Sequence, residues 1–391
     1  MCTKDQGVRT VSGRNFRKSF TTILLMVVIL WFPALTEAFC KKPHPGIDGG
    51  ITVMTQNLYV GADILSVAEA PSLGDIPVLV AATFNNMIMS DFQGRAKMVA
   101  ARIAAEDPDL VGLQEVSLLR RQSPGDFMQG NPDPATEIVL DYLAILMDEL
   151  RMLGLHYKVA VVAENADIEM PMFVGLENSA PQFDDVRLTD RDVILAKSSI
   201  KTWDVTRYSF RNIYMVSIGG LPIVFKRGFV AVTAKVRGET FRFVNAHLEV
   251  RENTVQVGEE TAAIQLLQAE ELTNELRREK LPLILTGDFN SSPLDPCGYA
   301  YSYIRDEGYF DVWNYRVTGN CEQGYTCCQA EDLLNEASLL VERIDHVFIR
   351  TRSGCVGPVF AYAVGDEPGD KTESGLWPSD HAGVVAVFRL P

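Results

Sequence analysis

The pattern of hydrophobic and polar positions along the chain predicts a mixed α/β structure. Apolar residues recur at helical spacing in residues 95–106 and 258–279, and a further helix is predicted at residues 134–153. Short apolar runs rich in β-branched and aromatic residues predict strands at residues 51–57, 110–115, 157–163, 191–198, 222–236, 240–250, 281–286, 343–350 and 383–390. Because strands outnumber helices and the two alternate irregularly, we expect an α/β sandwich.

Two of the predicted strands form a hairpin. The short polar turn at residues 237–239 separates strand material at residues 229–236 and 240–250. In the second of these strands, Asn245 and His247 fall on the same face, because successive side chains of a strand alternate between its faces. The hairpin therefore presents an amide and an imidazole together.

Three segments fit no regular pattern. Residues 63–91, 164–190 and 312–340 are expected to be loops or insertions, which often carry specificity. The apolar, aromatic stretch at residues 208–229 is interpreted as a core strand, with peripheral membrane contact as the less favoured alternative.

The N-terminal residues differ from the rest of the chain. Basic residues precede an uncharged run at residues 19–36, its apolar heart lies at residues 23–35, and small residues follow as far as Ala38. This layout predicts a signal peptide at residues 1–38 and a linker at residues 39–50, and hence a secreted or periplasmic protein. An uncleaved membrane anchor is the alternative, although the apolar run is shorter than the roughly 20 residues of a spanning helix.

The charge balance argues against tight binding to nucleic acids. The chain has 391 residues, of which 47% are hydrophobic and 22% charged, as expected for a globular protein. Removal of residues 1–38 takes away five bases and two acids, which leaves 31 bases against 49 acids and a formal charge of −18. Such a surface repels phosphate backbones at long range, so no stable nucleic-acid complex is expected. A local basic groove or bound cations would offset this repulsion, so a nuclease is not excluded.

The cysteine count also fits an exported protein. Removal of the predicted signal peptide leaves an even number of cysteines, which favours disulfides over a zinc site in that compartment. These cysteines are Cys40, Cys297, Cys321, Cys327, Cys328 and Cys355. The adjacent pair Cys327 and Cys328 matches no standard zinc spacing. The sequence leaves the connectivity of the disulfides open.

Polar residues at the ends of predicted strands are the candidates for chemistry, because ligands bind at strand ends in α/β folds. Asn57 and Glu115 each end an apolar strand, and their oxygen atoms are the kind of ligand that Mg²⁺ prefers. Asp288 and Asn290 flank Phe289 at the end of another strand. We expect Asp288 to orient or deprotonate a water molecule and Asn290 to hold a phosphoryl oxygen. For each residue taken singly, an ordinary turn or a solvated acid is the alternative.

Histidine is scarce, and two of the five histidines lie in candidate motifs. His247 is one of these, and His381 is the other, next to Asp380. Asp345, on a strand that we expect nearby, would fix the tautomer of His381. His346 should point to the opposite face of its strand and is left out of the predicted site. The chain contains no Gly-x-Ser-x-Gly motif and no Walker phosphate loop, so serine catalysis and nucleotide-driven chemistry lose support.

The order of these motifs resembles a known superfamily. The motifs are Asn57, Gln114-Glu115, Gly287-Asp288-Phe289-Asn290, Arg343-Ile344-Asp345 and Ser379-Asp380-His381. Together they resemble the endonuclease/exonuclease/phosphatase superfamily, which includes deoxyribonuclease I, exonuclease III, neutral sphingomyelinases and inositol polyphosphate 5-phosphatases. The resemblance implies a single domain at residues 51–391, built as a four-layer α/β sandwich. Two mixed β-sheets would pack face to face and be flanked by helices.

The resemblance also implies roles for individual residues. Mg²⁺, with Mn²⁺ or Ca²⁺ as alternatives, would be bound chiefly by Glu115, with Asn57 close by and Asp380 completing the network. Asp288 and Asn290 would position water and phosphate for in-line attack, without a covalent intermediate. The charge that develops on the phosphoryl group would be stabilised by His381, which Asp345 holds.

His247 narrows the branch of the superfamily. The run from Asn245 to Glu249 resembles the histidine-bearing strand of the deoxyribonuclease I, sphingomyelinase and 5-phosphatase branches, whereas the exonuclease III branch lacks this histidine. The acidic partner of this histidine has no unambiguous match. Asp190 and Asp192 both lie in the right region, and Asp192 is the favoured choice.

Three functions follow from these observations. The first is a secreted, metal-dependent phosphoesterase, with a sphingomyelinase-like lipid phosphodiesterase as a variant. The second is an extracellular nuclease like deoxyribonuclease I, for which residues 120–121, 226–227 and 277–278 are the candidate basic clusters. The third is a catalytically silent binding protein. The block that includes Arg227 to Val230 and residues 324–329 also resembles predicted secreted bacterial members of unnamed substrate, and we expect its vicinal cysteines to brace a rim over the site.

Overall fold

The computed structural model describes residues 47, 49–130, 133–218, 220–251, 255–295, 298–317, 323–354 and 357–391. The predicted signal peptide and most of the predicted linker lie outside the described residues, and so do Cys40, Cys297, Cys321 and Cys355.

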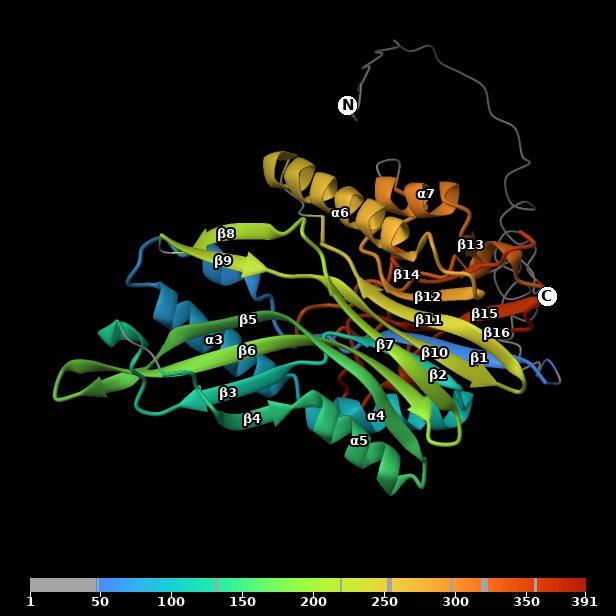
Figure 1. Ribbon diagram of the computed structural model, residues 1–391. Coiled ribbons are helices and arrows are strands. Elements are labelled where there is room, and N and C mark those ends of the chain that lie inside the picture. Colours follow the sequence, from blue (N-terminus) through green and yellow to red (C-terminus); the bar gives the residue numbers. More distant parts are fainter. Residues whose placement is uncertain are drawn as a thin grey trace, which may run out of the picture.

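Two β-sheets form the centre of the domain (Figure 1). The larger sheet has the order β15 (Val359–Val364), β16 (Gly383–Phe388), β1 (Ile51–Asn57), β2 (Leu110–Gln114), β6 (Ala180–Lys197), β3 (Leu118–Gln122) and β4 (Glu137–Asp141), with β5 (Tyr157–Glu177) paired to β6. The smaller sheet has the order β13 (Phe310–Asp311), β14 (Asp345–Arg350), β12 (Leu283–Asp288), β11 (Glu239–His247), β10 (Gly228–Val236) and β7 (Lys201–Ser209). Both sheets contain parallel and antiparallel pairs, as predicted.

The sheets pack face to face and helices cover their outer faces. Side chains of both sheets form the core between them. For example, Val53 of β1 and Phe243 of β11 belong to the same buried cluster. Helices α4 (Phe92–Glu106) and α5 (Tyr142–Met152) cover the larger sheet, and α6 (Val255–Leu276) and α7 (Tyr299–Asp306) cover the smaller one (Figure 1). This is the predicted four-layer sandwich.

The predicted hairpin between β10 and β11 is confirmed. Val236 pairs with Glu239, so Arg237 and Gly238 form a two-residue turn. Their φ angles are +48° and +97°, the positive values that a tight hairpin turn requires at both central positions. Residues Asn245 and His247 lie on the buried second strand, where both side chains are almost fully inaccessible.

The helix predicted at residues 134–153 is wrong in its first half. Residues Glu137–Asp141 form strand β4, which pairs antiparallel with β3. The helix α5 begins only after Asp141, whose side chain accepts hydrogen bonds from the amides of Leu143 and Ala144 and so caps the helix. The β-branched pair Ile138 and Val139 favours the strand.

Two of the three segments expected to be loops are regular. Residues 63–91 contain the 3₁₀ helix η1 (Leu65–Glu69) and the helix α3 (Ile76–Met89). Residues 164–190 extend β5 and β6 into one long hairpin, which projects at the left of Figure 1. The described parts of the third segment, residues 312–317 and 323–340, are largely irregular as expected, apart from the 3₁₀ helix η3 (Val312–Tyr315).

The stretch interpreted as a core strand at residues 208–229 is also different from the prediction. Strands β8 (Tyr214–Ile218) and β9 (Leu221–Phe225) form a separate two-stranded sheet. This hairpin, η1, α3 and strands β3, β5 and β6 line an apolar cavity of about 80 Å³. Its lining residues are Ile64, Val67, Val80, Thr83, Phe84, Met87, Leu119, Ile168, Met170, Val186, Leu188, Ile218, Ile223 and Phe225. Thr83 is the only polar residue among them.

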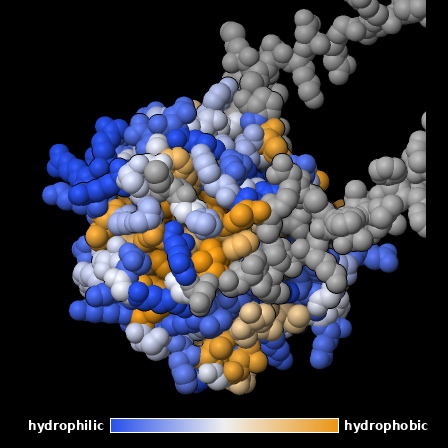
Figure 2. Space-filling model, turned by 90° about the vertical axis from the view of Figure 1, so that its right-hand side faces the viewer, coloured by the Kyte–Doolittle hydropathy of each residue, from blue (hydrophilic) through white to orange (hydrophobic). Residues whose placement is uncertain are grey.

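The face on the right-hand side of Figure 1 exposes both hydrophobic and hydrophilic residues. Figure 2 views it from the right-hand side of Figure 1 and shows hydrophobic residues in separate patches among hydrophilic ones. Scattered apolar residues of this kind are ordinary for a protein surface. Within the described residues, none of the helices combines the length and the hydrophobicity needed to cross a membrane.

Candidate active site

The predicted site residues meet at one edge of the sandwich because the strands that carry them end or begin there. In the larger sheet, the parallel strands β1 and β2 end side by side, with Asn57 opposite Gln114. In the smaller sheet, the parallel strands β11 and β12 end with His247 opposite Asp288. Strand β14 starts at the same edge with Asp345 opposite Asp288. The topology thus gathers residues that are far apart in sequence.

Asn57 links the acids of the two sheets. Its Nδ2 donates to Oδ2 of Asp288 at 3.0 Å and to Oε1 of Glu115 at 3.1 Å. Its Oδ1 accepts the amide of Tyr59 at 2.9 Å, and Oε2 of Glu115 accepts the amide of Val60 at 2.8 Å. These four bonds hold the carboxylates of Asp288 and Glu115 on either side of one amide group.

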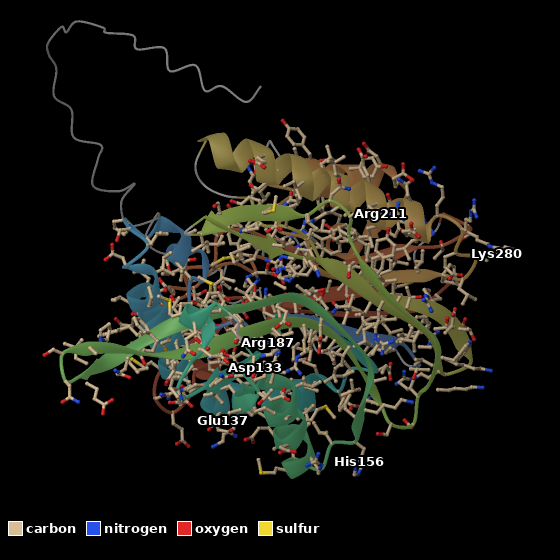
Figure 3. The ribbon with its side chains drawn as sticks, turned by 60° about the vertical axis from the view of Figure 1, so that its left-hand side comes forward. Asp133, Glu137, His156, Arg187, Arg211 and Lys280 are labelled. Atoms are coloured by element: carbon tan, nitrogen blue, oxygen red, sulfur yellow. A yellow bond between two sulfur atoms is a disulfide. The ribbon has the colours of Figure 1, made fainter. Side chains whose placement is uncertain are left out.

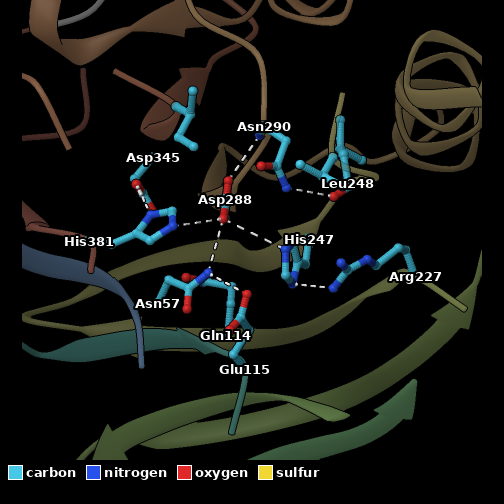
Figure 4. Close-up of polar contacts among 12 residues, drawn as sticks. Asn57, Gln114, Glu115, Arg227, His247, Leu248, Asp288, Asn290, Asp345 and His381 are labelled. Carbon is cyan, nitrogen blue, oxygen red and sulfur yellow. Dashed lines mark hydrogen bonds and ion pairs between the residues drawn. The ribbon is translucent and has the colours of Figure 1, made fainter. Parts of the chain in front are cut away.

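Asp288 lies at the centre of the polar cluster (Figure 4). Its Oδ2 is 3.6 Å from Nε2 of His247 and 3.9 Å from Nε2 of His381. Its Oδ1 accepts the backbone amide of Asn290 at 2.9 Å. Burial, reinforced by the nearby carboxylate of Asp345, raises the pKa of Asp288 to about 7. A carboxylate with such a pKa is a suitable proton acceptor near neutral pH.

His381 is held by an acid, as predicted. Its Nδ1 bonds to Oδ2 of Asp345 at 2.8 Å. Burial favours the neutral imidazole, but the carboxylates of Asp345, Asp380 and Asp288 outweigh this effect and raise the pKa of His381 well above its usual value. Burial also raises the pKa of Asp380 to about 6.

The partner of His247 differs from the expected one. Nη1 of Arg227 lies 3.0 Å from Nδ1 of His247, so a base occupies the position where an acid was expected. Asp192 is fully buried and accepts a hydrogen bond from Nδ2 of Asn165 at 2.9 Å. Oδ2 of Asp190 lies 3.5 Å from the same guanidinium nitrogen. The acids of this region therefore face Arg227 and Asn165, and Asp192 makes no described contact with His247.

Other predicted residues have supporting roles. Asn290 has a φ of +49°, and its Nδ2 donates to the carbonyl of Leu248 at 3.0 Å, so its side chain ties β11 to β12. Nε2 of Gln56 reaches the carbonyl of His381 at 3.2 Å, and Oγ of Ser379 donates to the carbonyl of Asn57 at 2.8 Å. The first and the last motif of the chain are thus bonded directly to each other.

The segment around Thr326, whose vicinal cysteines were expected to brace a rim over the site, contacts the site through hydrogen bonds. The carbonyl of Thr326 accepts the amide of Ala382 at 2.8 Å, and the amide of Gln329 donates to the carbonyl of Asp380 at 2.9 Å. Oγ1 of Thr326 accepts the amides of Ile344 and Asp345, each at 3.1 Å. Cys327 and Cys328, between these two anchors, form a disulfide with each other. These hydrogen bonds, and not the disulfide between two adjacent residues, hold the segments of Asp345 and His381 together.

We expect Thr326→Val to lower kcat for phosphoester hydrolysis by about tenfold. Valine has nearly the same shape but no acceptor for the two amides, and one lost acceptor costs about 1–2 kcal/mol. Thr326→Ser keeps the hydroxyl and should retain nearly the wild-type kcat. Steady-state kinetics of both variants would check this, and equal kcat for valine and serine would contradict the assigned role.

His346, which was left out of the predicted site, is buried away from it. Its Nε2 bonds to the carbonyl of Ser291 at 3.0 Å, and its Nδ1 lies 3.3 Å from Nη1 of Arg343. Burial, with a further contribution from Arg343, lowers the pKa of His346 to about 4. The folded protein therefore holds this side chain neutral.

This burial predicts a dependence of stability on pH. The unfolded chain binds a proton at His346 near pH 6.5, whereas the folded chain binds it only near pH 4, so acidification between these values favours unfolding. The effect amounts to about 3 kcal/mol of unfolding free energy over this interval. Between pH 7 and pH 4, the free energy of unfolding measured with denaturant should decrease less in His346→Gln than in the wild type. Equal losses would exclude His346 as the source.

The donor set fits a hard divalent cation. Glu115 is a carboxylate near enough to contribute to the raised pKa of Asp380, and Asn57 adds an amide beside Glu115. Asp288, Asp345 and His381 also bring ligand atoms within 4.8 Å of one another, but these groups bond among themselves. Oxygen ligands of this kind suit Mg²⁺, which usually takes one or two protein carboxylates. Glu115, Asn57 and Asp380 would hold such an ion.

The remaining histidine among the described residues, His156, is not part of the site. His156 lies exposed in the turn between α5 and β5 (Figure 3). Of the residues predicted from the sequence, the structure brings together Asn57, Glu115, His247, Asp288, Asn290, Asp345, Asp380 and His381. It adds Arg227 and Thr326, for which the strand-end pattern gave no signal.

Comparisons with known proteins agree with this arrangement. Residues 86–381 match the model of the Endonuclease/Exonuclease/phosphatase family. The chain is similar to a solved family member from Bacteroides thetaiotaomicron at 16% identity and a TM-score of 0.50, covering 87% of this chain and 98% of that one.

Two further solved structures have similar folds. A mannosyl-6-phosphatase from Bacteroides thetaiotaomicron shares 16% identity at a TM-score of 0.49, covering 87% of this chain and 100% of the other. TDP2 from D. rerio, complexed with single-strand DNA product, shares 16% identity at a TM-score of 0.49, covering 88% of this chain and 100% of the other. No curated protein matches the chain. The match of the family model extends over most of the chain and includes every site motif except Asn57, so the chain belongs to the endonuclease/exonuclease/phosphatase family.

Proposed function

We propose that this protein is a secreted, Mg²⁺-dependent phosphoesterase that hydrolyses its substrate by in-line attack of water. The observation that carries the proposal is the placement of Asp288 between two imidazole groups, with Asn57 connecting it to Glu115. Family membership supports hydrolysis of a phosphoester. The signal-peptide pattern supports export.

The residues divide the chemistry among them. Asp288 accepts a proton from the attacking water, because its carboxylate is buried and its pKa is raised to about 7. His247 and His381 present Nε2 toward the same oxygen of Asp288 and can contact phosphoryl oxygens bound there. Asp345 holds His381 in this orientation. A divalent cation bound by Glu115, Asn57 and Asp380 would supply stabilisation of the negative charge on the phosphoryl group.

A panel of substrates tests the proposal. The mature chain, residues 39–391, would be assayed on bis-p-nitrophenyl phosphate, plasmid DNA, sphingomyelin and phosphomonoesters, with Mg²⁺ and with EDTA. We expect turnover of at least one substrate that EDTA abolishes and added Mg²⁺ restores. Absence of turnover on every substrate would leave the catalytically silent binding protein as the better account, and turnover unaffected by EDTA would reject the metal requirement.

The apolar cavity favours a lipid phosphodiester as the substrate class. Leu188 lines the cavity two residues before Asp190 on β6, and Phe225 lines it two residues before Arg227. Because alternate residues of a strand share a face, Leu188 lies on the same face of β6 as Asp190. Leu188 and Phe225 thus lie two residues from Asp190 and Arg227, which contact each other beside His247, and an apolar tail would extend toward the cavity when the phosphoester occupies the site.

The alternative of a nuclease finds less support in the arrangement of bases. Arg121 donates to Asp184 at 2.6 Å through Nε, and Arg120 lies 3.5 Å from Asp167. Arg187 (Figure 3) also pairs with Asp167. These pairs neutralise the cluster at residues 120–121, one of the three basic clusters that could bind a phosphate backbone. Cleavage of plasmid DNA at a higher kcat/KM than sphingomyelin would nevertheless establish the nuclease and reject the lipid substrate.

A further inference from the structure

The contact between Arg227 and His247 fixes where the imidazole carries its proton. A guanidinium group has only donors and keeps its charge in proteins. Nη1 of Arg227 lies 3.0 Å from Nδ1 of His247, so this nitrogen must be the acceptor. A neutral imidazole has one proton, which therefore resides on Nε2.

The neighbours of Arg227 hold it in this position. Nη1 lies 3.5 Å from Oδ2 of Asp190, and Nε lies 3.9 Å from Oε1 of Glu249. The side chain is only 15% exposed. Arg227 immediately precedes Gly228, which pairs with His247 across β10 and β11, so the backbone also aims the guanidinium at this histidine. Asp190 and Glu249 thus hold the guanidinium of Arg227 against the imidazole of His247.

The two histidines that flank Asp288 therefore differ in the protonation of Nδ1. Nδ1 of His381 faces a carboxylate and must carry a proton, whereas Nδ1 of His247 faces a guanidinium and must not. The charged groups around His247 are Arg227, Asp288 and His381, and both bases oppose its protonation. Its Nε2 points toward Oδ2 of Asp288 at 3.6 Å, slightly longer than a hydrogen bond.

We propose that Arg227 is a positioning residue that locks His247 as a neutral hydrogen-bond donor. The donor is Nε2–H, directed at the space beside Asp288 where the phosphoryl group binds. His247 then stabilises the phosphoryl oxygens and does not protonate the leaving group. The leaving group takes its proton from solvent water, and the proton that Asp288 accepts from the attacking water is returned to solvent. This inference rests on the proposed phosphoesterase function for its chemical meaning, but the tautomer itself does not.

His346 supplies a reference for this tautomer within the same chain. Its Nδ1 also faces a guanidinium, that of Arg343, while its Nε2 bonds to a backbone carbonyl at 3.0 Å. A carbonyl can only accept, so the proton of His346 must be on Nε2. His346 and His247 should consequently give the same spectroscopic signature.

Nitrogen-15 NMR of the full mature chain, labelled at histidine and free of metal, tests the tautomer directly. Near neutral pH we expect His247 and His346 both to show a protonated Nε2 and an unprotonated Nδ1. Arg227→Met should shift His247 away from this state, and Arg227→Lys, which keeps a donor and the charge, should shift it less. Lys226→Met removes the exposed neighbouring base and should change nothing. A wild-type His247 that is protonated on Nδ1 would overturn the proposal.

Leaving-group dependence tests the catalytic consequence. His247→Gln keeps a donor, and we expect it to lower kcat by the same factor for a diester that releases p-nitrophenol and for one that releases an alkyl alcohol. If His247 protonates the leaving group, the loss will be far larger for the alkyl alcohol, and the proposal will be wrong. Failure of the proposed function can be distinguished from failure of this inference. If the tautomer is confirmed but no phosphoester is hydrolysed, the proposed function is rejected and the role of Arg227 in fixing the tautomer of His247 stands.

Discussion

Asp288→Asn should lower kcat for phosphoester hydrolysis by about 10²- to 10⁴-fold, the range expected when a general base is lost. Oδ2 of Asp288 is the atom that Asn57, His247 and His381 all face. Asparagine has almost the same shape but cannot accept a proton from water. Steady-state kinetics with the preferred substrate at saturating Mg²⁺ would measure the effect.

The same substitution should leave the fold intact. Burial raises the pKa of Asp288 to about 7, so the folded state disfavours the carboxylate charge that asparagine removes. The free energy of unfolding near neutral pH should therefore not decrease. Asp306→Asn, at the exposed end of α7, is the matched control and should retain wild-type kcat. An Asp288→Asn variant with more than a tenth of the wild-type kcat would exclude Asp288 as the base.

Much of the site could be predicted because its residues are attached to strong sequence signals. Asn57, Glu115 and Asp288 each follow an apolar run that is short enough to be a buried strand. In an α/β fold such strand ends meet at one edge. The distances between residues as remote as Asn57 and Asp288 could not be obtained in this way, since they depend on how the two sheets pack.

Arg227 could not be assigned because its role depends on a contact across strands. It lies between β9 and β10 without any motif that marks it as part of a site. The hints in the sequence were the missing acidic partner of His247 and the resemblance of the block that begins at Arg227 to predicted secreted members of the superfamily, and neither assigned a role to Arg227. In the structure, Arg227 occupies the position beside His247 where an acid was expected, and Asp190 pairs with Arg227. Arg227 is therefore the residue that departs from the expected pattern, and it sets the tautomer of His247.

The long hairpin of β5 and β6 and the helix α3 were the least predictable parts of the fold. The long hairpin of β5 and β6 contains bulges, including one between Glu164 and Asp167, and these break the two-residue alternation on which strand prediction depends. In the same way, α3 has a proline, Pro77, as its second residue and packs on β5, which no local pattern indicates. These elements line the apolar cavity, so the part of the molecule that favours a substrate class came from the structure.

His381→Gln should lower kcat by about 10²- to 10³-fold, as expected when a group that stabilises the transition-state charge is removed. Asp345 acts through this histidine, because its Oδ2 accepts the Nδ1 proton at 2.8 Å and so sets the orientation of Nε2 toward Asp288. Asp345→Asn should lower kcat as well, to a smaller extent. His156→Gln, exposed in the turn before β5, should have no effect.

The double variant Asp345→Asn/His381→Gln separates a shared role from two independent ones. If Asp345 works only by holding His381, the double variant should lose no more activity than His381→Gln alone, because residues that act as a unit are not additive. Losses that multiply would show that Asp345 acts on the substrate or the metal by itself. Its second carboxylate oxygen, Oδ1, is buried and has no hydrogen-bond partner among the described residues, so it is the atom that such an independent role would use.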